Sequence, residues 1–435
     1  MKQFFLKALK KTLRRLAKIT LWRYNPKIVG ITGNVGKTST KIAVEKVLSC
    51  KFRVRASAKS FNNELGFPLA IIGNWQEIGG YFFWLKVVLF GIVQIIFKKR
   101  SYPEILVLEY GIDRPGDMKY LLEIARPQVG VITAIGKIPV HIEYFTGKEQ
   151  LLKEKAKLVN QLPATGFAIL NADDTDVYKI KDRTRAQVVT FGFTEKADMR
   201  ITTFGTVFSK RTAAVNFKLN YGGNFIPVHL ENILGKTRGY TSAAAALVGL
   251  VFGINLVTIS ETLAGCYTLP GRMKILKGIK NSWIIDDTYN AAPLATEAAL
   301  CTLKDLKAKR KIAVLGDMLE IGKYTAEAHE KVGQLAGKFV DVLITIGMRS
   351  KFISKTAGDI GMTKNNIHHF GKASEAGKFL QNEIKEGDVI LIKASQAVRL
   401  EKIVKEVMAE PDRARELLVR QNKKWLTKRG SYESR

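Results

Sequence analysis

The sequence predicts an α/β protein with a central domain built on a parallel sheet and a C-terminal Rossmann-like α/β domain. Short apolar runs of strand length alternate with longer helical patterns through residues 27–110, as in consecutive βαβ units. The same alternation begins again after Pro270-Gly271. With 435 residues, of which 46% are hydrophobic, the chain is long enough to form more than one packed core.

The first strand and helix enclose the most informative motif. Apolar Ile28-Val29 precedes the turn Gly33-Asn34-Val35-Gly36-Lys37-Thr38-Ser39, and a helical pattern follows it. Strand, glycine-rich turn and helix is the layout of a phosphate-binding loop (P-loop), in which glycines let backbone N–H groups approach phosphate oxygens. The spacing is the short G-x-x-G-K-T form, since Ile31 stands where the longer form has glycine. We expect Lys37 to reach the phosphates of a nucleotide and Thr38 to bind Mg²⁺. The alternative is an ordinary turn between strand and helix.

The remaining elements follow in order along the chain. Apolar runs predict strands of the first domain at 105–108, 129–133 and 167–170. Residues 198–230 alternate apolar and polar residues, which indicates antiparallel strands. Strands of the second domain are expected at 283–285, 312–315, 342–345 and 389–392. Helices are expected at 148–162, 241–253, 294–307 and 325–338. This pattern is that of a doubly wound α/β domain following a P-loop domain.

The predicted organisation has a basic amphipathic helix at 1–26 and a central nucleotide-binding domain at 27–269. A second α/β domain at 270–410 and a basic tail at 411–435 follow. An apolar insertion at 76–100 interrupts the central domain.

The charge balance favours anionic partners. A net charge of +31 attracts nucleic acid, anionic lipid or phosphorylated substrates, and a general bias toward lysine is the alternative. The sequence contains no nucleic-acid-binding signature, so we expect no nucleic-acid partner. Cys50, Cys266 and Cys301 lie far apart and form no metal or disulfide pattern, which fits a reducing, cytoplasmic location without structural zinc.

The N-terminal segment has the pattern of a helix that lies on a membrane surface. Residues 2–23 contain eight Lys or Arg and no acidic residue. One helical face carries Lys7, Lys10, Lys11, Arg14 and Lys18, and another carries Phe5, Leu9, Leu13, Leu16 and Thr20. Basic residues interrupt every apolar run and no cleavage site follows, so the segment is not a signal peptide.

A second apolar segment extends from Tyr81 to Phe97 and ends at Lys98-Lys99-Arg100. Its length is borderline for a transmembrane helix. The loop at 30–40 and the strand at 105–110 belong to one sheet, which a single crossing would divide across the bilayer. We therefore expect a hairpin or in-plane insertion, or a helix buried against residues 1–23. Two interpretations remain open: attachment to an anionic membrane surface at the inner face of the cell membrane, or two mutually packed soluble helices.

Several short motifs follow one another along the chain. They are Gly33–Thr40, Lys59–Pro68, Glu109-Tyr110-Gly111, His141–Phe145, Lys155, Asn171–Asp174, Pro270-Gly271-Arg272, Asp286–Pro293 and Leu315–Gly322. Together they resemble the Mur ligases over roughly residues 28–405, most of all the branch that adds D-alanyl-D-alanine.

The resemblance implies an ATP-dependent ligase that uses ATP and Mg²⁺. In this family a substrate carboxylate is phosphorylated to an acyl phosphate, and an amine then attacks to form an amide bond. The implied partners are a cell-wall precursor and an amino acid or a dipeptide such as D-alanyl-D-alanine. One alternative is a ligase for another acceptor, such as a folate-like or poly-amino-acid substrate. Another is a non-catalytic, membrane-associated scaffold that binds ATP.

The resemblance also implies roles for single residues. Lys37 would hold the phosphates, His141 would bind a second metal ion, Lys155 would be carbamoylated, and Arg272 would contact phosphate near the interdomain hinge; these are the catalytic candidates. The metal candidates are Thr38, Glu109 and His141. The residues implied to bind the nucleotide are Gly33, Asn34, Gly36, Lys37, Thr38, Ser39, Asp287, Tyr289 and Asn290. Asn62 and Asn63 would lie beside the reacting centre as substrate residues.

Each role has an ordinary structural alternative. Glu109 can be a solvated acid at a strand end, and Lys155 a solvated helix lysine between Lys153 and Lys157. His141 can be a structural histidine, and Arg272 a surface loop residue. Asn62 and Asn63 can form a turn. We expect His329 to be structural.

Other parts of the chain depart from the family pattern. About 27 residues precede the first strand, so we expect this sequence to hold no counterpart of the family's first domain, which grips the uridine nucleotide of the substrate. Gly235-Lys236-Thr237-Arg238 replaces Gly-x-His-Asn, so an adenine contact is absent or supplied by stacking of Arg238. Asn290-Ala291-Ala292-Pro293 replaces Asn-Ala-Asn-Pro, and Lys393-Ala394-Ser395-Gln396 replaces Lys-Gly-Ser-Arg. We therefore expect altered substrate recognition and a membrane-bound or lipid-linked acceptor.

Overall fold

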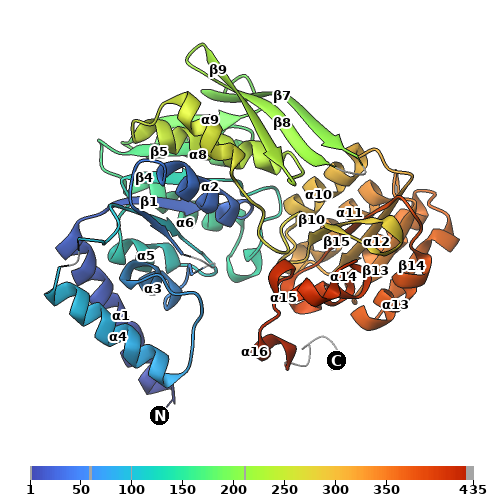
Figure 1. The fold of residues 1–435 in the computed structure, drawn as a ribbon, viewed down its shortest axis with the longest axis horizontal. Coiled ribbons are helices and arrows are strands. Elements are labelled where there is room, and N and C mark those ends of the chain that lie inside the picture. Colours follow the sequence, from blue (N-terminus) through green and yellow to red (C-terminus); the bar gives the residue numbers. More distant parts are fainter. Residues whose placement is uncertain (1, 58–60, 99, 210–211, 428–435) are drawn as a thin grey trace.

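The computed structural model describes residues 2–57, 61–98, 100–209 and 212–427. Two sheets flanked by helices form the two halves of the molecule, with the N-terminus on the first half and the C-terminal helices on the second (Figure 1). The predicted fold class, a P-loop domain with a parallel sheet followed by a Rossmann-like α/β domain, is confirmed. Lys59 and Ser60 of the motif Lys59–Pro68 lie outside the described residues.

The first sheet has the strand order β2-β3-β1-β4-β5-β6-β7-β8-β9. Its strands are β1 (Lys27–Thr32), β2 (Val54–Ala56), β3 (Ile105–Glu109), β4 (Val129–Ile132), β5 (Phe167–Asn171), β6 (Gln187–Gly192), β7 (Met199–Phe208), β8 (Ala213–Tyr221) and β9 (Asn224–Glu231). β1 to β6 run parallel, and β1, β3 and β4 are buried on both faces, which is why these three read as continuous apolar runs. β7 to β9 pair antiparallel, as the alternation across 198–230 predicts.

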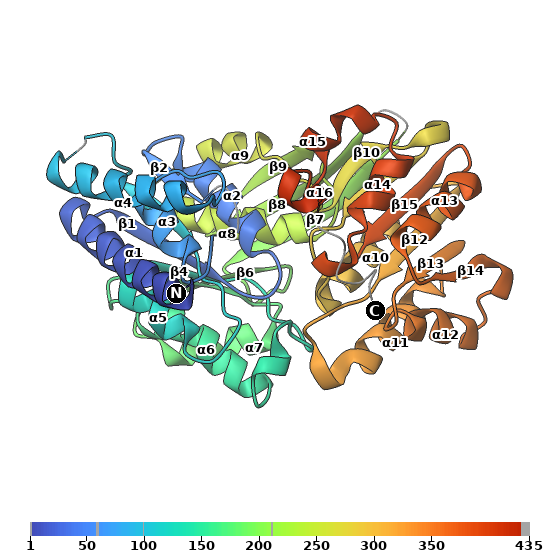
Figure 2. The same cartoon turned by 90° about the horizontal axis from the view of Figure 1, so that it is seen from below.

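Helices cover both faces of this sheet (Figures 1 and 2). They are α1 (Lys2–Tyr24), α2 (Lys37–Leu48), α3 (Gly66–Ile72), α4 (Tyr81–Ile96), α5 (Asp117–Ile124), α6 (Lys148–Asn160), α7 (Thr175–Tyr178), α8 (Thr237–Val251) and α9 (Leu256–Ala264). α2, α8 and α9 share one core with one face of the sheet, in which Val47 packs against Gly249 of α8. α1, α3, α5 and α6 contribute to the core on the other face.

The second sheet has the order β10-β11-β15-β12-β13-β14, with β10 antiparallel and the others parallel. Its strands are β10 (Lys274–Lys277), β11 (Trp283–Asp287), β12 (Arg310–Gly316), β13 (Val342–Ile346), β14 (Ile367–Phe370) and β15 (Asp388–Lys393). Its helices are α10 (Pro293–Asp305), α11 (Thr325–Ala336), α12 (Lys351–Asp359), α13 (Ala373–Glu383), α14 (Glu401–Val407), α15 (Ala414–Leu417) and α16 (Lys423–Leu426). Part of the predicted basic tail therefore forms α15 and α16, and residues 428–435 lie outside the described part of the chain.

The two apolar segments form helices that lie side by side (Figures 1 and 2). The rings of Phe5 and Tyr81 are 5.6 Å apart, and Tyr24 Oη donates to the Gln94 carbonyl oxygen at 2.6 Å, so α1 and α4 run in the same direction. Residues 81–96 form one continuous helix rather than a hairpin, and its inner face packs against α1. Within the described ranges, the helices are all too short or too polar to cross a membrane.

Candidate active site

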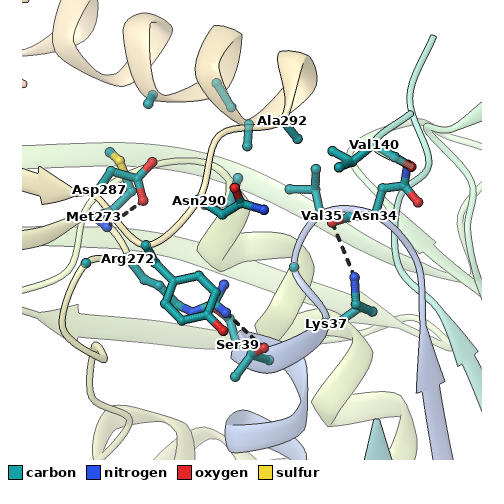
Figure 3. A pocket seen from close by; sticks show the side chains of 18 of the residues that line it. Asn34, Val35, Lys37, Ser39, Val140, Arg272, Met273, Asp287, Asn290 and Ala292 are labelled. Atoms are coloured by element: carbon teal, nitrogen blue, oxygen red, sulfur yellow. Dashed lines mark hydrogen bonds between the residues drawn. The ribbon is translucent and has the colours of Figure 1, made fainter. Parts of the chain in front are cut away.

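A cavity of about 360 Å³ lies where the first and second domains meet. It is lined by the P-loop, by the loops at Gly271–Met273 and Asp287–Asn290, and by α10. β1, β3, β11 and β15 all end at this cleft, and the carboxyl ends of parallel strands are the usual place for a ligand in such folds. Figure 3 shows Asn290 facing Val35 of the P-loop, and Arg272 reaching from its loop toward the start of α2 beside Ser39.

The P-loop conformation requires glycine at two positions. Gly33 has φ +138°, and a Cβ there would lie 2.1 Å from Thr133 Oγ1. Gly36 has φ +90° and immediately precedes α2. The first-turn N–H groups of α2 have no partner within the helix and point toward the cavity end of the loop, where an anion is stabilised. The local sequence thus folds into the anion-binding turn that the motif predicts.

A chain of hydrogen bonds joins the two domains at Thr38. Arg272 Nη2 donates to Thr38 Oγ1 at 3.1 Å, and Thr38 Oγ1 donates to Glu109 Oε2 at 3.0 Å. The other carboxylate oxygen, Glu109 Oε1, accepts from Asn62 Nδ2 at 3.3 Å. Lys41 Nζ lies 3.9 Å from Glu109 Oε2. Glu109 is only 2% exposed, so the ordinary alternative of a solvated strand-end acid does not describe it.

Two lysines meet at the P-loop. Lys37 Nζ donates to the Gly33 carbonyl oxygen at 2.8 Å, and Lys155 Nζ donates to the same oxygen at 3.3 Å. Burial lowers the pKa of Lys37, although Glu109 opposes that shift. Burial, reinforced by the charge of Lys37, lowers the pKa of Lys155 well below its ordinary value. Lys155 is 1% exposed, so the solvated-lysine alternative does not describe it either.

His141 lies between two acidic side chains from distant parts of the chain. Its Nε2 is 3.5 Å from Asp113 Oδ1 and its Nδ1 is 3.2 Å from Glu320 Oε2. The backbone is held in the left-handed region, with φ +68°, by a hydrogen bond from His141 N to the Glu320 carbonyl oxygen at 2.8 Å. Burial lowers the pKa of His141 to about 4, and Asp113 opposes the shift while Lys37 and Lys155 add to it. The imidazole is therefore neutral at pH 7 and can act as a metal ligand.

The loop Asp287–Asn290 of the second domain is held in place by the buried side chain of Lys393. Lys393 Nζ donates to Asp287 Oδ2 at 2.6 Å and to the Asn290 carbonyl oxygen at 2.9 Å. Asp287 Oδ1 accepts from Met273 N at 3.1 Å. The Arg272 guanidinium lies 4.0 Å from the centre of the Tyr289 ring. Asp287 thus holds the loop in place and, together with Tyr289 and Asn290, lines the cavity.

Asn63, Arg238 and His329 have identifiable structural contacts. Asn63 Oδ1 accepts from Gly66 N at 2.9 Å, so it shapes the turn before α3, whereas Asn62 reaches Glu109. Arg238 donates from Nη2 to the Arg272 carbonyl oxygen at 2.8 Å, and burial lowers its pKa to about 10. His329 Nε2 accepts from Met318 N at 3.0 Å, which orders the turn after β12.

Several residues of the site are not among those predicted from the sequence. Among them are Lys41 beside Glu109, Asp113 and Glu320 beside His141, Lys393 under Asp287, and Arg420. Arg420, after α15, donates from Nη2 to the Tyr289 carbonyl oxygen at 2.5 Å. Glu320 and Lys393 fall inside or beside motifs quoted above, so inspection of their neighbours could have found them. Asp113 and Arg420 have no comparable local signal.

The residues present fit a nucleoside triphosphate with a divalent cation. A hydroxyl and a carboxylate oxygen, from Thr38 and Glu109, form the oxygen-only ligand set that Mg²⁺ prefers. The buried side-chain atoms Asn34 Oδ1 and Arg272 Nε have no hydrogen-bond partner among the described residues, and both residues line the cavity. A second cavity of about 470 Å³ shares Val35, Gly36 and Thr237 with the first. Its lining includes the apolar side chains of Phe191 and Leu294, which can pack against the flat ring of a nucleotide base.

Comparisons with known proteins agree with this geometry. The Mur ligase middle domain model matches residues 90–249, and the model for the Mur ligase glutamate ligase domain matches residues 271–396. The chain is 28% identical to a UDP-N-acetylmuramoyl-tripeptide–D-alanyl-D-alanine ligase of Bacillus subtilis, over 92% of this chain and 79% of the relative. MurF ligase from Thermotoga maritima, solved in complex with ADP, superposes with a TM-score of 0.75 at 26% identity, covering 91% of this chain and 83% of that one. Folylpolyglutamate synthase of Mycobacterium tuberculosis, solved with ADP, has a TM-score of 0.65 at 12% identity, over 92% and 94% of the two chains, and shares the fold.

Fold, P-loop and interdomain cleft together define an ATP-dependent ligase that uses Mg²⁺. The chain belongs to the Mur ligase family.

Proposed function

We propose that the protein forms an amide bond between a carboxylate of a cell-wall precursor and an amino acid or dipeptide, with ATP converted to ADP and phosphate. The hydrogen bond from Arg272 to Thr38 carries this proposal. It brings a guanidinium of the second domain onto the residue that would hold Mg²⁺, where charge develops during phosphoryl transfer.

The proposed roles follow from the contacts. Thr38 and Glu109 would hold Mg²⁺, which neutralises phosphate charge, and Asn62 orients Glu109. Lys37 and Arg272 would release their present contacts to stabilise the transferring phosphoryl group. Positioning and charge neutralisation are what this reaction chiefly needs from a protein.

We propose that Lys155 carries a carbamate. Carbamate formation requires the neutral amine, which attacks CO₂ and loses a proton, and burial beside Lys37 favours that neutral form. The product is an anion near Lys37 and the P-loop, so it is attracted to the Lys37 ammonium. His141, with Asp113 and Glu320 beside it, would bind a second cation near the acceptor carboxylate.

For the substrates, we infer the class named for the relatives: a muramoyl-peptide carboxylate as acceptor and D-alanyl-D-alanine as amine. The test is release of phosphate by the purified full chain with ATP, Mg²⁺, UDP-N-acetylmuramoyl-tripeptide and D-alanyl-D-alanine. We expect phosphate release that depends on both substrates, and a product whose mass is their sum minus water. Lys37→Ala should abolish both signals.

The same assay separates the alternatives. Phosphate release with a folate-like or poly-amino-acid acceptor, but with no muramoyl peptide, would replace the proposed substrate and keep the ligase. ATP binding without any amine-dependent phosphate release would point to the non-catalytic scaffold.

We also propose that the protein attaches to the inner face of the cell membrane through α1 and α4. The outward faces of these helices leave large apolar side chains exposed, with Trp22 at 80%, Phe82 at 82% and Phe97 at 69%. Neither helix contains an acidic residue. Exposed apolar residues flanked by Lys and Arg are typical of helices that lie in an anionic membrane interface.

Flotation with lipid vesicles tests this attachment. The full chain should bind vesicles that contain phosphatidylglycerol better than vesicles of pure phosphatidylcholine. The variant Trp22→Ser/Phe82→Ser/Phe97→Ser should lose binding, whereas Phe225→Ser, which removes an exposed ring of the distant β8–β9 hairpin, should not. Equal flotation of both variants would refute the α1–α4 surface.

A further inference from the structure

A third cavity, of about 480 Å³, adjoins the nucleotide cavity. The two share Asn62, Asp113, His141 and Glu320 in their linings. The third cavity extends from these residues to Leu6 and Lys10 of α1. A molecule in it would have one end at the proposed second-cation site and the other end at the N-terminal half of α1.

The α1 end of this third cavity carries the apolar Leu6 and the cation Lys10, and the cavity is also lined by the acidic residues Glu64, Asp113, Asp117 and Glu320. Leu6 is 40% exposed, and Lys10 Nζ pairs with Glu64 across the cavity lining. Arg114 lies 5.6 Å from the centre of the Tyr144 ring, and both residues line the cavity. A ligand whose carboxylate lies near His141 would bring its anionic group to Arg114, and to Lys10 once the Lys10–Glu64 pair opens.

The third cavity is continuous with the exposed surface of α1 and α4. Leu6 lines the cavity, and its neighbour Phe5 contacts Tyr81 at the start of α4 with 5.6 Å between ring centres. Tyr81, Phe82 and Leu85 continue the exposed apolar face along α4. A helix that lies in a membrane interface sinks its apolar face only about 5–10 Å below the headgroups, so a cavity beside that helix stays at headgroup level.

From this continuity we propose that the third cavity is the acceptor subsite and that it takes an amphiphilic acceptor from the membrane. The acceptor is a peptide carboxylate joined through an anionic, phosphate-bearing head to an acyl or isoprenyl anchor. Its carboxylate reaches His141, its head meets Lys10 and Arg114, and its anchor stays in the bilayer under α1 and α4. This inference rests on the proposed ligase function and adds the source of its acceptor.

A comparison of two acceptors with the same peptide tests the inference. One acceptor is UDP-N-acetylmuramoyl-tripeptide in solution, and the other is the same muramoyl peptide joined by phosphate to an isoprenyl chain in phosphatidylglycerol vesicles. We expect kcat/KM for the anchored acceptor to exceed that for the free acceptor at least tenfold. In Trp22→Ser/Phe82→Ser/Phe97→Ser the ratio should fall toward one, while Phe225→Ser should keep the full ratio. A ratio near one in the unmodified chain would overturn the inference and leave the ligase function standing.

A binding experiment tests the cavity without turnover. The full chain with Leu6→p-benzoylphenylalanine, irradiated on vesicles that hold the anchored acceptor, should form a crosslink to it. The crosslink should be lost in excess free muramoyl peptide and absent when the photoreactive residue is at Phe225. Lys10→Glu should raise the KM for the acceptor several-fold more than the KM for ATP. A crosslink to bulk phospholipid alone, with no change in the acceptor KM, would show that α1 binds membrane but does not line the acceptor subsite. If phosphate release needs no acceptor at all, the proposed ligase function fails instead.

Discussion

Arg272 links the two domains at the centre of the site, so its removal tests the geometry most directly. In Arg272→Ala the protein loses the hydrogen bond to Thr38 at 3.1 Å and the contact with the Tyr289 ring at 4.0 Å. A charge-assisted hydrogen bond contributes about 1.5–3 kcal/mol. At 1.36 kcal/mol per factor of ten, its loss lowers kcat/KM by about 10- to 150-fold. If Arg272 also stabilises the phosphoryl transition state, the decrease reaches about a thousandfold or more.

The assay is amine-dependent phosphate release, with kcat and KM for ATP measured separately. Arg272→Lys keeps the charge but not the planar fork, so we expect only partial recovery of kcat. Arg53→Ala is the matched control, because Arg53 makes an exposed ion pair with Glu104 at 3.6 Å. That control should change kcat/KM less than twofold. A threefold or smaller effect of Arg272→Ala, with unchanged thermal unfolding, would refute the assignment and leave Arg272 as an ordinary loop residue.

Other perturbations have equally defined outcomes. Glu109→Gln removes the charge opposite Thr38 and should raise the Mg²⁺ concentration for half-maximal activity by about tenfold or more; superimposable Mg²⁺ titrations would contradict this. Lys393→Met leaves Asp287 without its buried partner and should lower the free energy of unfolding of the second domain by about 3–5 kcal/mol, read from urea midpoints. Burial lowers the pKa of His329, so the unfolded chain takes up a proton first as pH falls below about 6.5, and stability is then lost by up to about 1.4 kcal/mol per pH unit. Urea midpoints are measured at pH 7.5 and 5.5, about one unit on each side of the ordinary pKa of His. His329→Gln should lose less stability between these pH values than the unmodified protein; equal losses would exclude His329 as the source.

Periodicity predicted the buried strands because each forms one long apolar run between turns. β1, β3 and β4 are such runs, and their burial on both faces explains why no alternation is visible. β2 is only three residues long and pairs along its length with β3, so its strand conformation depends on a partner some fifty residues away. α8 begins at Thr237, four residues before the predicted start at 241, because the changed segment Gly235–Arg238 already forms its first turn.

The site residues, like the strands, divide into those that a local sequence pattern predicts and those that only the tertiary structure brings together. The P-loop is local in sequence, so its turn and glycines could be predicted from one segment. The grouping of Asp113, His141 and Glu320 depends on three loops from two domains that meet only in the folded chain. The lysine-rich helix pattern left open whether Lys155 is solvated like Lys153, but Lys153 is exposed whereas the Lys155 side chain is buried and reaches the P-loop. Whether a charged residue on a helix is buried therefore depends on which distant segment packs against it, and the helix sequence alone does not show this.

The two interpretations of the apolar segments do not exclude each other. Leu13 and Leu16 of α1 are buried, and Leu16 packs near Gly91 of α4, as two mutually packed helices require. Phe5, placed by periodicity on that same face, is instead 43% exposed, because α1 extends beyond the core at its N-terminal end (Figure 1).

This arrangement decides which experiment is informative. Deleting α1 would remove Leu13 and Leu16 from the core, so the protein would lose stability whether or not it binds a membrane. Substitutions at Trp22, Phe82 and Phe97 change only exposed side chains, where the cost to folding is small. A loss of vesicle binding in such a variant, at unchanged thermal stability, therefore reports on the membrane surface and not on the core.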